Sequence, residues 1–202
     1  MVRENTLSSL LVSRRSIRRY TPEPVPAPLI EHLLAAAVWS PSAHNRQPWR
    51  FAVVMDAARK EMLARQMGDQ LRRDLEADGV PPDVIAADTG RSYARITSAP
   101  AAIVLCLSMQ DMDCYPDKRR AENEVLMAVQ STAMAGQNLL LAAHEAGLGA
   151  CWMCAPLFCQ GVVRDALDLP SEWQPQALIT LGYPAETKVK TRHPLEKSIV
   201  WR

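Results

Sequence analysis

Hydrophobic and polar positions along the chain follow two patterns, one with the period of a helix and one typical of a buried strand. Helices are predicted near 7–11, 28–40 and 57–78, where apolar residues recur every three to four positions, and also near 83–95, 122–146 and 158–167. Continuous apolar runs of strand length occur at 49–55, 101–107 and 177–181, with a shorter one at 198–201. Several helices are therefore expected around a small group of strands.

Prolines, glycines and capping residues predict where these elements end. Residues 21–28 carry four prolines, which forbid a helix and favour an extended connector, and Pro28 suits a first helical position. Asp56 can cap the helix after it. That helix is expected to turn Leu63, Met67, Leu71 and Leu75 inward and Lys60, Arg65, Arg72, Arg73 and Glu76 outward. The helix at 122–146 is apolar nearly all round, which is typical of a helix buried centrally or against a partner subunit.

The order of these elements predicts an α+β (mixed α/β) fold, a small sheet flanked by helices. The chain has 202 residues, enough for one domain with a real core and too few for two. We find no internal repeat or linker and expect one domain over 1–202, with 183–202 as a C-terminal extension. This Lys- and Pro-rich extension has little core of its own and needs another surface to become ordered, which indicates a homodimer.

Charge and composition limit the possible partners. The formal net charge is +1, so neither nucleic acid nor a membrane surface is attracted globally, and any anion site must be local. The most apolar stretch, 125–143, is interrupted by five polar residues and predicts no membrane span. The N-terminus lacks the apolar run of a signal peptide. The five cysteines are an odd number, which favours a reducing, cytoplasmic location over a disulfide framework.

The strongest local feature is a run of basic residues without acids. Residues 5–22 hold four arginines, with Ser13 and Ser16 among them. A guanidinium binds phosphate through two hydrogen bonds, and serine hydroxyls complete such a site. A solvated helix end would explain the same charges. However, a second basic group, Lys188, Lys190 and Arg192, lies in the extension, and one phosphate bound from both ends of the chain would explain both groups.

Two other segments could carry chemistry. The amides in 40–49 could pair with a heterocyclic ring, although a turn before a structural Trp explains them more simply. Cys151 and Cys154 form a CxxC pair, but the chain lacks the further ligands of a zinc site. A thiol redox pair should follow a strand, which is not evident here. The favoured interpretation is that Cys151 and Cys154 are two small side chains near a binding site. No metal site is expected.

Taken in order, four segments resemble the nitroreductase family. They are Arg14-Arg15-Ser16-Ile17-Arg18, SPSAHNRQPWRF at 40–51, AGLGACWM at 146–153 and Lys190-Thr191-Arg192-His193-Pro194. The resemblance covers almost the whole chain. It implies a homodimer with one FMN at each of two interface sites. It also implies a small mixed sheet flanked by helices. A domain-swapped C-terminal extension of the partner completes the edge of that sheet.

The resemblance also implies roles for individual residues. By position, Arg14, Arg15, Ser16 and Arg18 look like contacts to the FMN phosphate and ribityl chain, with Arg192 and Lys190 joining the phosphate. The residues that look like contacts from the other subunit to the same flavin are Pro41, Ser42, Ala43 and Asn45. Met153 and Cys154 fall where a backbone amide faces the flavin N5, so no side chain is expected to be catalytic.

The implied activity is ping-pong electron transfer from NADPH or NADH through FMN to a small electron-poor aromatic acceptor, such as a nitro compound, a quinone or a flavin-like molecule. The segments 147–184, 71–75 and 115–117 resemble more narrowly the C-terminal reductase domain of a bifunctional enzyme that makes a deazaflavin coenzyme. That resemblance implies an FMN-dependent reductase of a dehydro precursor. A non-catalytic flavin-binding or flavin-cleaving protein is the alternative of another class.

Overall fold

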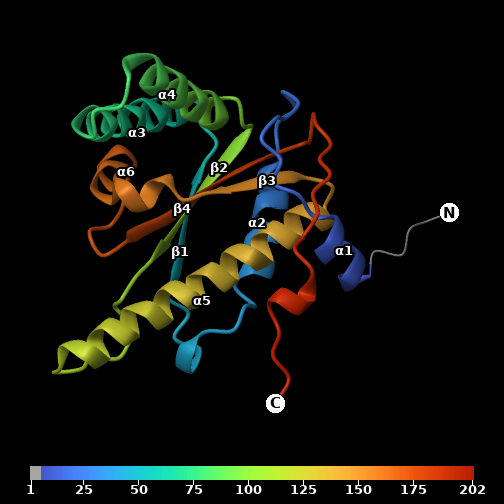
Figure 1. Ribbon diagram of the computed structural model, residues 1–202, viewed down its shortest axis with the longest axis vertical. Coiled ribbons are helices and arrows are strands. Elements are labelled where there is room, and N and C mark those ends of the chain that lie inside the picture. Colours follow the sequence, from blue (N-terminus) through green and yellow to red (C-terminus); the bar gives the residue numbers. More distant parts are fainter. Residues whose placement is uncertain (1–5) are drawn as a thin grey trace.

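The computed structural model describes residues 6–202, which form helices on both faces of a small sheet (Figure 1). The α-helices are α1 (Leu7–Ser13), α2 (Ala27–Ala37), α3 (Ala57–Ala77), α4 (Pro82–Thr97), α5 (Lys118–Glu145) and α6 (Gln160–Ala166). The strands are β1 (Trp49–Val54), β2 (Ala101–Leu107), β3 (Gly149–Met153) and β4 (Gln174–Gly182). Three 3-10 turns complete the list, η1 (Ala43–Asn45), η2 (Ala155–Phe158) and η3 (Leu195–Lys197). The predicted α+β class is confirmed.

The described strands lie in the order β1-β2-β4-β3 and pair antiparallel throughout. The expectation of a mixed sheet is therefore wrong for these four strands. The one parallel contact in the described chain is an isolated bridge between Ser16 and Ala150. The physical reason lies in the connection between β1 and β2. Helices α3 and α4 pack on each other as a hairpin and return the chain to the end of the sheet that it left, so β2 runs opposite to β1.

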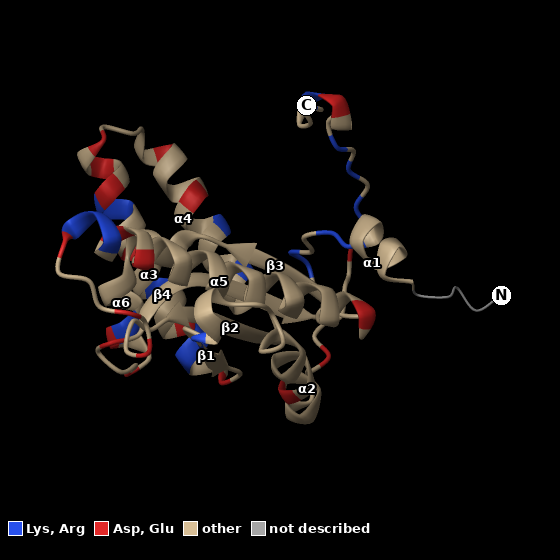
Figure 2. Ribbon diagram, turned by 90° about the horizontal axis from the view of Figure 1, so that it is seen from below, with Lys and Arg blue, Asp and Glu red and all other residues tan. Residues whose placement is uncertain are grey.

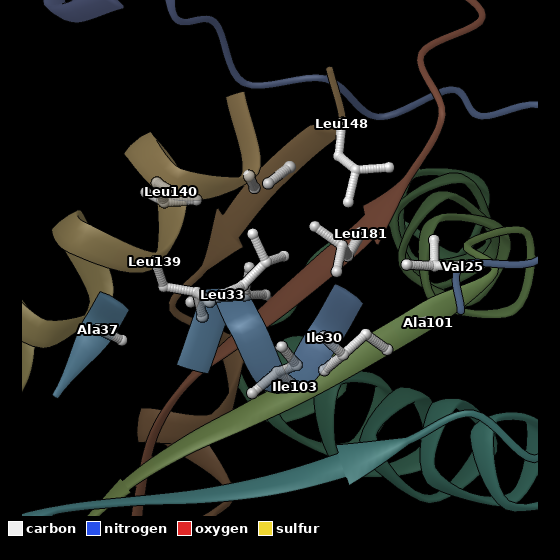
Figure 3. Packing of buried hydrophobic residues seen from close by; sticks show 13 residues of the cluster. Val25, Ile30, Leu33, Ala37, Ala101, Ile103, Leu139, Leu140, Leu148 and Leu181 are labelled. Carbon is white, nitrogen blue, oxygen red and sulfur yellow. The ribbon is translucent and has the colours of Figure 1, made fainter. Parts of the chain in front are cut away.

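Strand β2 shows why strands of this sheet appear in the sequence as continuous apolar runs. Ala101 and Ile103 belong to the core beneath α2 and α5, whereas Ala102, Val104 and Cys106 belong to the core beneath α3, α4 and α6. Successive side chains of a strand point to opposite faces, and helices cover both faces here. On the first face Leu33 of α2 and Leu139 of α5 gather over the sheet (Figure 3).

Two strand predictions need correction. Gly149–Met153 is a strand that the apolar pattern did not indicate, because it is short and begins with glycine. The predicted strand at 198–201 is wrong for the described chain, where these residues pair with no strand and Trp201 is 86 % exposed. A strand needs a partner to satisfy its backbone, and this segment runs away from the sheet of its own protomer (Figure 2).

Lys60 corrects the predicted orientation of one side chain on α3. It was expected to face outward, but it is only 6 % exposed. Its Nζ donates hydrogen bonds to the carbonyl oxygens of Ala99 and Pro100, at 2.5 and 3.1 Å, just after the end of α4. A buried ammonium is tolerated when it is hydrogen-bonded, and here it ties α3 to the chain that enters β2.

Helix α5 is, within the described chain, long and apolar enough by length and composition to cross a membrane. It nevertheless packs on the sheet and on α2, and it carries nine buried residues. Its remaining face leaves Val125, Leu126 and Met134 exposed. The position of α5 against the sheet is that of the core helix of a domain, as its apolar pattern predicted.

Candidate functional site

The arginine segment after α1 is held against the edge of the sheet. The N–H of Ile17 donates to the carbonyl of Ala150 in β3 at 3.0 Å, next to the bridge between Ser16 and Ala150. Ile17 itself is buried, and its side chain lies directly over Gly149. Because the side chain of Ile17 points into the core, the neighbouring polar side chains of Ser16 and Arg18 lie at the surface beside β3.

The C-terminal extension runs along the same segment. The N–H of Ala185 donates to the carbonyl of Arg19 at 3.0 Å, and Arg15 reaches the carbonyl of Lys190 at 3.4 Å. Figure 2 shows the blue segments of the extension close to those beside α1. The two basic groups, which include Arg15 and Lys190 and are far apart in the sequence, therefore meet in space, as the sequence predicted.

Together these segments enclose a pocket of about 210 Å³, here called the cation pocket. Its lining residues are Arg14, Arg15, Ser16, Arg18, Lys188, Lys190 and Arg192. Six of the seven are cationic, and within the described chain no carboxylate lines it. Glu186, close by, accepts a hydrogen bond from the Arg18 N–H at 2.7 Å and pairs with Lys188 at 3.0 Å. One carboxylate leaves most of this charge uncompensated.

The electrostatics of the cation pocket reflect this crowding. Burial, followed by the charges of Arg192 and Arg15, lowers the pKa of the Arg14 guanidinium. Burial and then Arg14 and Arg15 lower the pKa of His144, whose Nε2 lies 2.7 Å from the Ser13 Oγ. The buried Nε of Arg15 has no hydrogen-bond partner in the described chain. Clustered like charges and an unpartnered donor are stabilised by a bound anion, and guanidinium, ammonium and hydroxyl groups are the donors that a phosphate prefers.

A second pocket, of about 390 Å³, adjoins the first at Arg18, which lines both. We call it the edge pocket because β3 is the outermost strand of the sheet. One wall is the continuous segment Cys151, Trp152, Met153, Cys154 and Ala155. The opposite wall is α4, where Asp88, Arg91, Ser92 and Arg95 follow at helical spacing along one face. Met153 and Cys154 thus line a pocket that shares Arg18 with the cation pocket.

The segment at 41–45 lies elsewhere on the protomer. Ala43 donates its N–H to the Oγ of Ser131 in α5 at 3.2 Å, and Ser42 accepts from the Gln47 N–H at 3.1 Å. Asn45 has a positive φ of 54°, typical of a turn. Pro41, Ser42, Ala43 and Asn45 line neither the cation pocket nor the edge pocket. The structure therefore does not bring them to the arginines within one protomer.

Cys151 of the CxxC pair does not have the lowered pKa of a redox-active thiol. All five cysteines lie in the described chain and are free. Burial raises the pKa of the Cys151 thiol, and the nearby Arg18 only partly opposes this. Cys154 is exposed, and its Sγ accepts a hydrogen bond from the Trp152 indole at 3.2 Å. Because redox-active cysteines rely on a lowered pKa, the structure favours the interpretation of two small side chains at a binding site.

We therefore expect only a modest loss of activity when both cysteines are replaced. Cys151→Ser with Cys154→Ser keeps the size of both side chains and leaves the cations of Arg14 and Arg18 in place, so turnover should fall less than about tenfold. The measurement is steady-state turnover in the NADH- or NADPH-dependent reaction that the sequence resemblance implies. Complete loss of activity in a folded double variant would instead favour thiol chemistry.

Sequence reasoning missed part of this region. Lys188 was recognised as basic but not assigned to the site, and Trp152, Arg91 and Arg95 were not considered. The spacing of Asp88, Arg91 and Arg95 marks one polar face of a helix, but only the fold reveals that this face lies opposite β3.

Comparison with known proteins places the chain in a family. The model of the nitroreductase family matches residues 11–183. The chain belongs to the nitroreductase family. Among relatives, it is 32 % identical over 217 residues to NADH dehydrogenase of Thermus thermophilus, which covers 95 % of this chain and 93 % of that protein. It is 30 % identical over 201 residues to 5,6-dimethylbenzimidazole synthase of Rhodospirillum rubrum, covering 94 % and 84 %.

A solved structure agrees with this membership. A protein from Desulfovibrio desulfuricans, assigned as a nitroreductase and solved in complex with FMN, superposes with a TM-score of 0.77. The match covers 98 % of both chains at 28 % sequence identity. The two relatives carry different activities in their names, so membership of the nitroreductase family does not by itself identify a substrate.

Proposed function

We propose that this nitroreductase-family protein is an FMN-dependent oxidoreductase. It passes electrons from NADH or NADPH to a small electron-poor aromatic acceptor, such as a nitro compound, a quinone or a flavin-like molecule. The observation that carries the proposal is the cation pocket, which is joined through Arg18 to the edge pocket beside β3. A ligand with an anionic end and a flat ring fits such a pair of pockets, and the D. desulfuricans relative with this fold binds FMN.

The residues of the cation pocket suit the phosphate and ribityl chain of FMN. Arg14, Arg15, Lys190 and Arg192 would bind the phosphate, with Lys188 beside them. Ser16 and Arg18 would follow toward the ribityl chain. Arg15 already has a buried Nε without a partner in the described chain, which supports a further acceptor there.

The segment at the end of β3 would receive the ring. Backbone amides near Met153 and Cys154 could donate a hydrogen bond to the flavin N5 from a fixed edge of the sheet. When bound, FMN supplies hydride chemistry between donor and acceptor in a ping-pong sequence. The side chains of this segment offer no evident general acid or base, so solvent would supply protons, and the chain's work is binding and orientation.

The active form that we propose is a homodimer with a domain-swapped extension. In each protomer Pro41, Ser42, Ala43 and Asn45 are displayed away from the cation pocket, so they could contact the flavin of the partner. The extension leaves large apolar side chains uncovered, Val189, Leu195, Val200 and Trp201. Together with the exposed residues of α5 they form surface that a second copy would bury. We further propose one domain over 1–202 and a cytoplasmic location, which the free thiols support.

The decisive experiment is to purify the protein, extract and identify its flavin, and titrate it anaerobically with NADH and with NADPH. The flavin absorbance should bleach with at least one nucleotide and recover on addition of a quinone or nitro compound. Flavin that binds but never bleaches would contradict the proposal and favour a non-catalytic or flavin-cleaving protein. The acceptors should include the dehydro precursor of the deazaflavin coenzyme, because the narrower resemblance stays a prediction.

A further inference from the structure

A third pocket lies between α3 and η2, and the proposed function does not yet use it. Its volume is about 290 Å³, and we call it the apolar pocket. Met67, Leu71 and Leu75 of α3 form one wall, and Phe158 of η2 forms the other. Leu71 and Leu75 were expected inside the core, but both stay only half-buried because this hollow lies beside them.

The apolar pocket adjoins the edge pocket. Leu71, Ser92 and Ala155 line both. Ala155 directly follows Cys154, so the opening lies one residue from the segment that would face the flavin ring. An acceptor stacked on a flavin in the edge pocket could therefore extend a substituent between α3 and η2. At about 30 Å³ for each water-sized group, the space holds roughly ten non-hydrogen atoms.

The charges at the apolar pocket restrict that substituent. Asp74 and Asp78 are among its lining residues, and in the described chain no Lys or Arg is. Asp74 accepts a hydrogen bond from the Gln70 Nε2 at 2.7 Å. Burial and then the charge of Asp74 raise the pKa of the Cys159 thiol, which places this carboxylate close to the pocket wall. A negatively charged substituent would be repelled here, in contrast to the cation pocket.

Phe158 supplies a separate observation. It is 79 % exposed, although η2 is held by hydrogen bonds at both ends, from the Leu157 N–H to Cys154 O at 3.0 Å and from the Cys159 N–H to Pro156 O at 3.1 Å. Phe158 is therefore displayed on an ordered turn at the pocket mouth. A large aromatic ring in this position gains most when it covers an apolar ligand.

We propose that the apolar pocket is a specificity site that binds an uncharged, apolar substituent of the aromatic acceptor. This inference rests on the proposed function, because the ring of the acceptor would stack on the flavin ring that occupies the edge pocket. The substrate class is thereby narrowed to acceptors with an apolar chain or second ring of up to about ten heavy atoms, and anionic substituents are disfavoured.

The test uses redox-inert probes and measures binding rather than activity. The Kd values of 4-methyl-, 4-propyl- and 4-pentylphenol are determined by calorimetry on the protein as purified. Each methylene that enters an apolar pocket should lower the Kd about threefold, so 4-pentylphenol should bind more than about tenfold tighter than 4-methylphenol. A phenol of equal length that ends in a carboxylate should lose that gain. Equal Kd values along the series would overturn the inference.

Two variants of η2 provide a matched comparison. Phe158→Ala removes a wall of the apolar pocket. It should at least halve the gain in affinity, measured as the change in log Kd from 4-methylphenol to 4-pentylphenol. Leu157→Ala removes a neighbouring exposed side chain that does not line the pocket and should leave the gain intact. An equal effect of both variants would overturn the inference. Flavin bleaching by NADH or NADPH, measured on the same samples, reports the proposed function separately, so either idea can fail alone.

Discussion

Replacing Arg14 or Arg18 by alanine is expected to weaken FMN binding about ten- to a hundredfold in each variant. Both side chains are partly buried and line the cation pocket, so each can make a charge-assisted hydrogen bond to a phosphate or a neighbouring oxygen. Such a bond contributes about 1.5–3 kcal/mol, which corresponds to that change in Kd. The measurement is a titration of flavin-free protein with FMN, in which quenching of the flavin fluorescence reports binding.

Two controls separate phosphate binding from a general loss of charge. Arg19→Ala removes a cation from the same segment, but Arg19 is exposed and does not line the cation pocket, so the Kd should stay within about twofold. Riboflavin lacks the phosphate, so Arg14→Ala should hardly change its affinity. An unchanged Kd for FMN in both Arg14→Ala and Arg18→Ala would show that the phosphate assignment is wrong.

The second large effect is expected for Gly149→Ala in β3. An added Cβ would lie 2.7 Å from the Ile17 Cγ2 and 2.8 Å from its Cβ, closer than atoms can pack. Ile17 is buried and its N–H is bonded to Ala150, so the arginine segment must shift away from β3. We expect a cost of about 1–3 kcal/mol in the free energy of unfolding. FMN affinity should fall as well, because Ser16 and Arg18 move with Ile17.

Gly68→Ala is the matched control for this substitution. Gly68 lies within α3, and an added Cβ there would meet no atom within 4 Å. Alanine has the higher helix propensity, so this variant should gain about 0.5–1 kcal/mol. Thermal unfolding of both variants, with and without FMN, provides the comparison. A Gly149→Ala protein as stable as the wild type, with unchanged FMN affinity, would contradict the close contact between Ile17 and β3.

Much of the fold could be predicted because its signals are local. The apolar spacing of α3 and the cap at Asp56 predicted a helix, and Asp56 indeed accepts from the Arg59 N–H at 2.8 Å. The long helix α5 begins at Lys118, four residues earlier than predicted, because Asp117 caps it by accepting from the Arg120 N–H at 3.0 Å. Boundaries of this kind depend on a single side chain and are easily displaced.

The features that could not be predicted depend on contacts between distant segments. Strand β3 is a strand because β4 pairs with it, and its own five residues carry little apolar pattern. Lys60 is buried because the carbonyls of Ala99 and Pro100 fold back over α3. Antiparallel pairing followed from the α3–α4 hairpin, whose packing the apolar spacing does not describe.

The sequence by itself determined the α+β class, most of the elements, two basic groups at opposite ends of the chain and the family that they resemble. Periodicity, charge and residue type within short segments are sufficient for these conclusions. The tertiary structure alone decided that the two basic groups line one pocket, that Arg18 joins it to the edge of β3, and that α4 and η2 bound the space beyond. A pocket is formed by side chains from segments far apart in the chain, so its walls are known only when packing has brought those segments together.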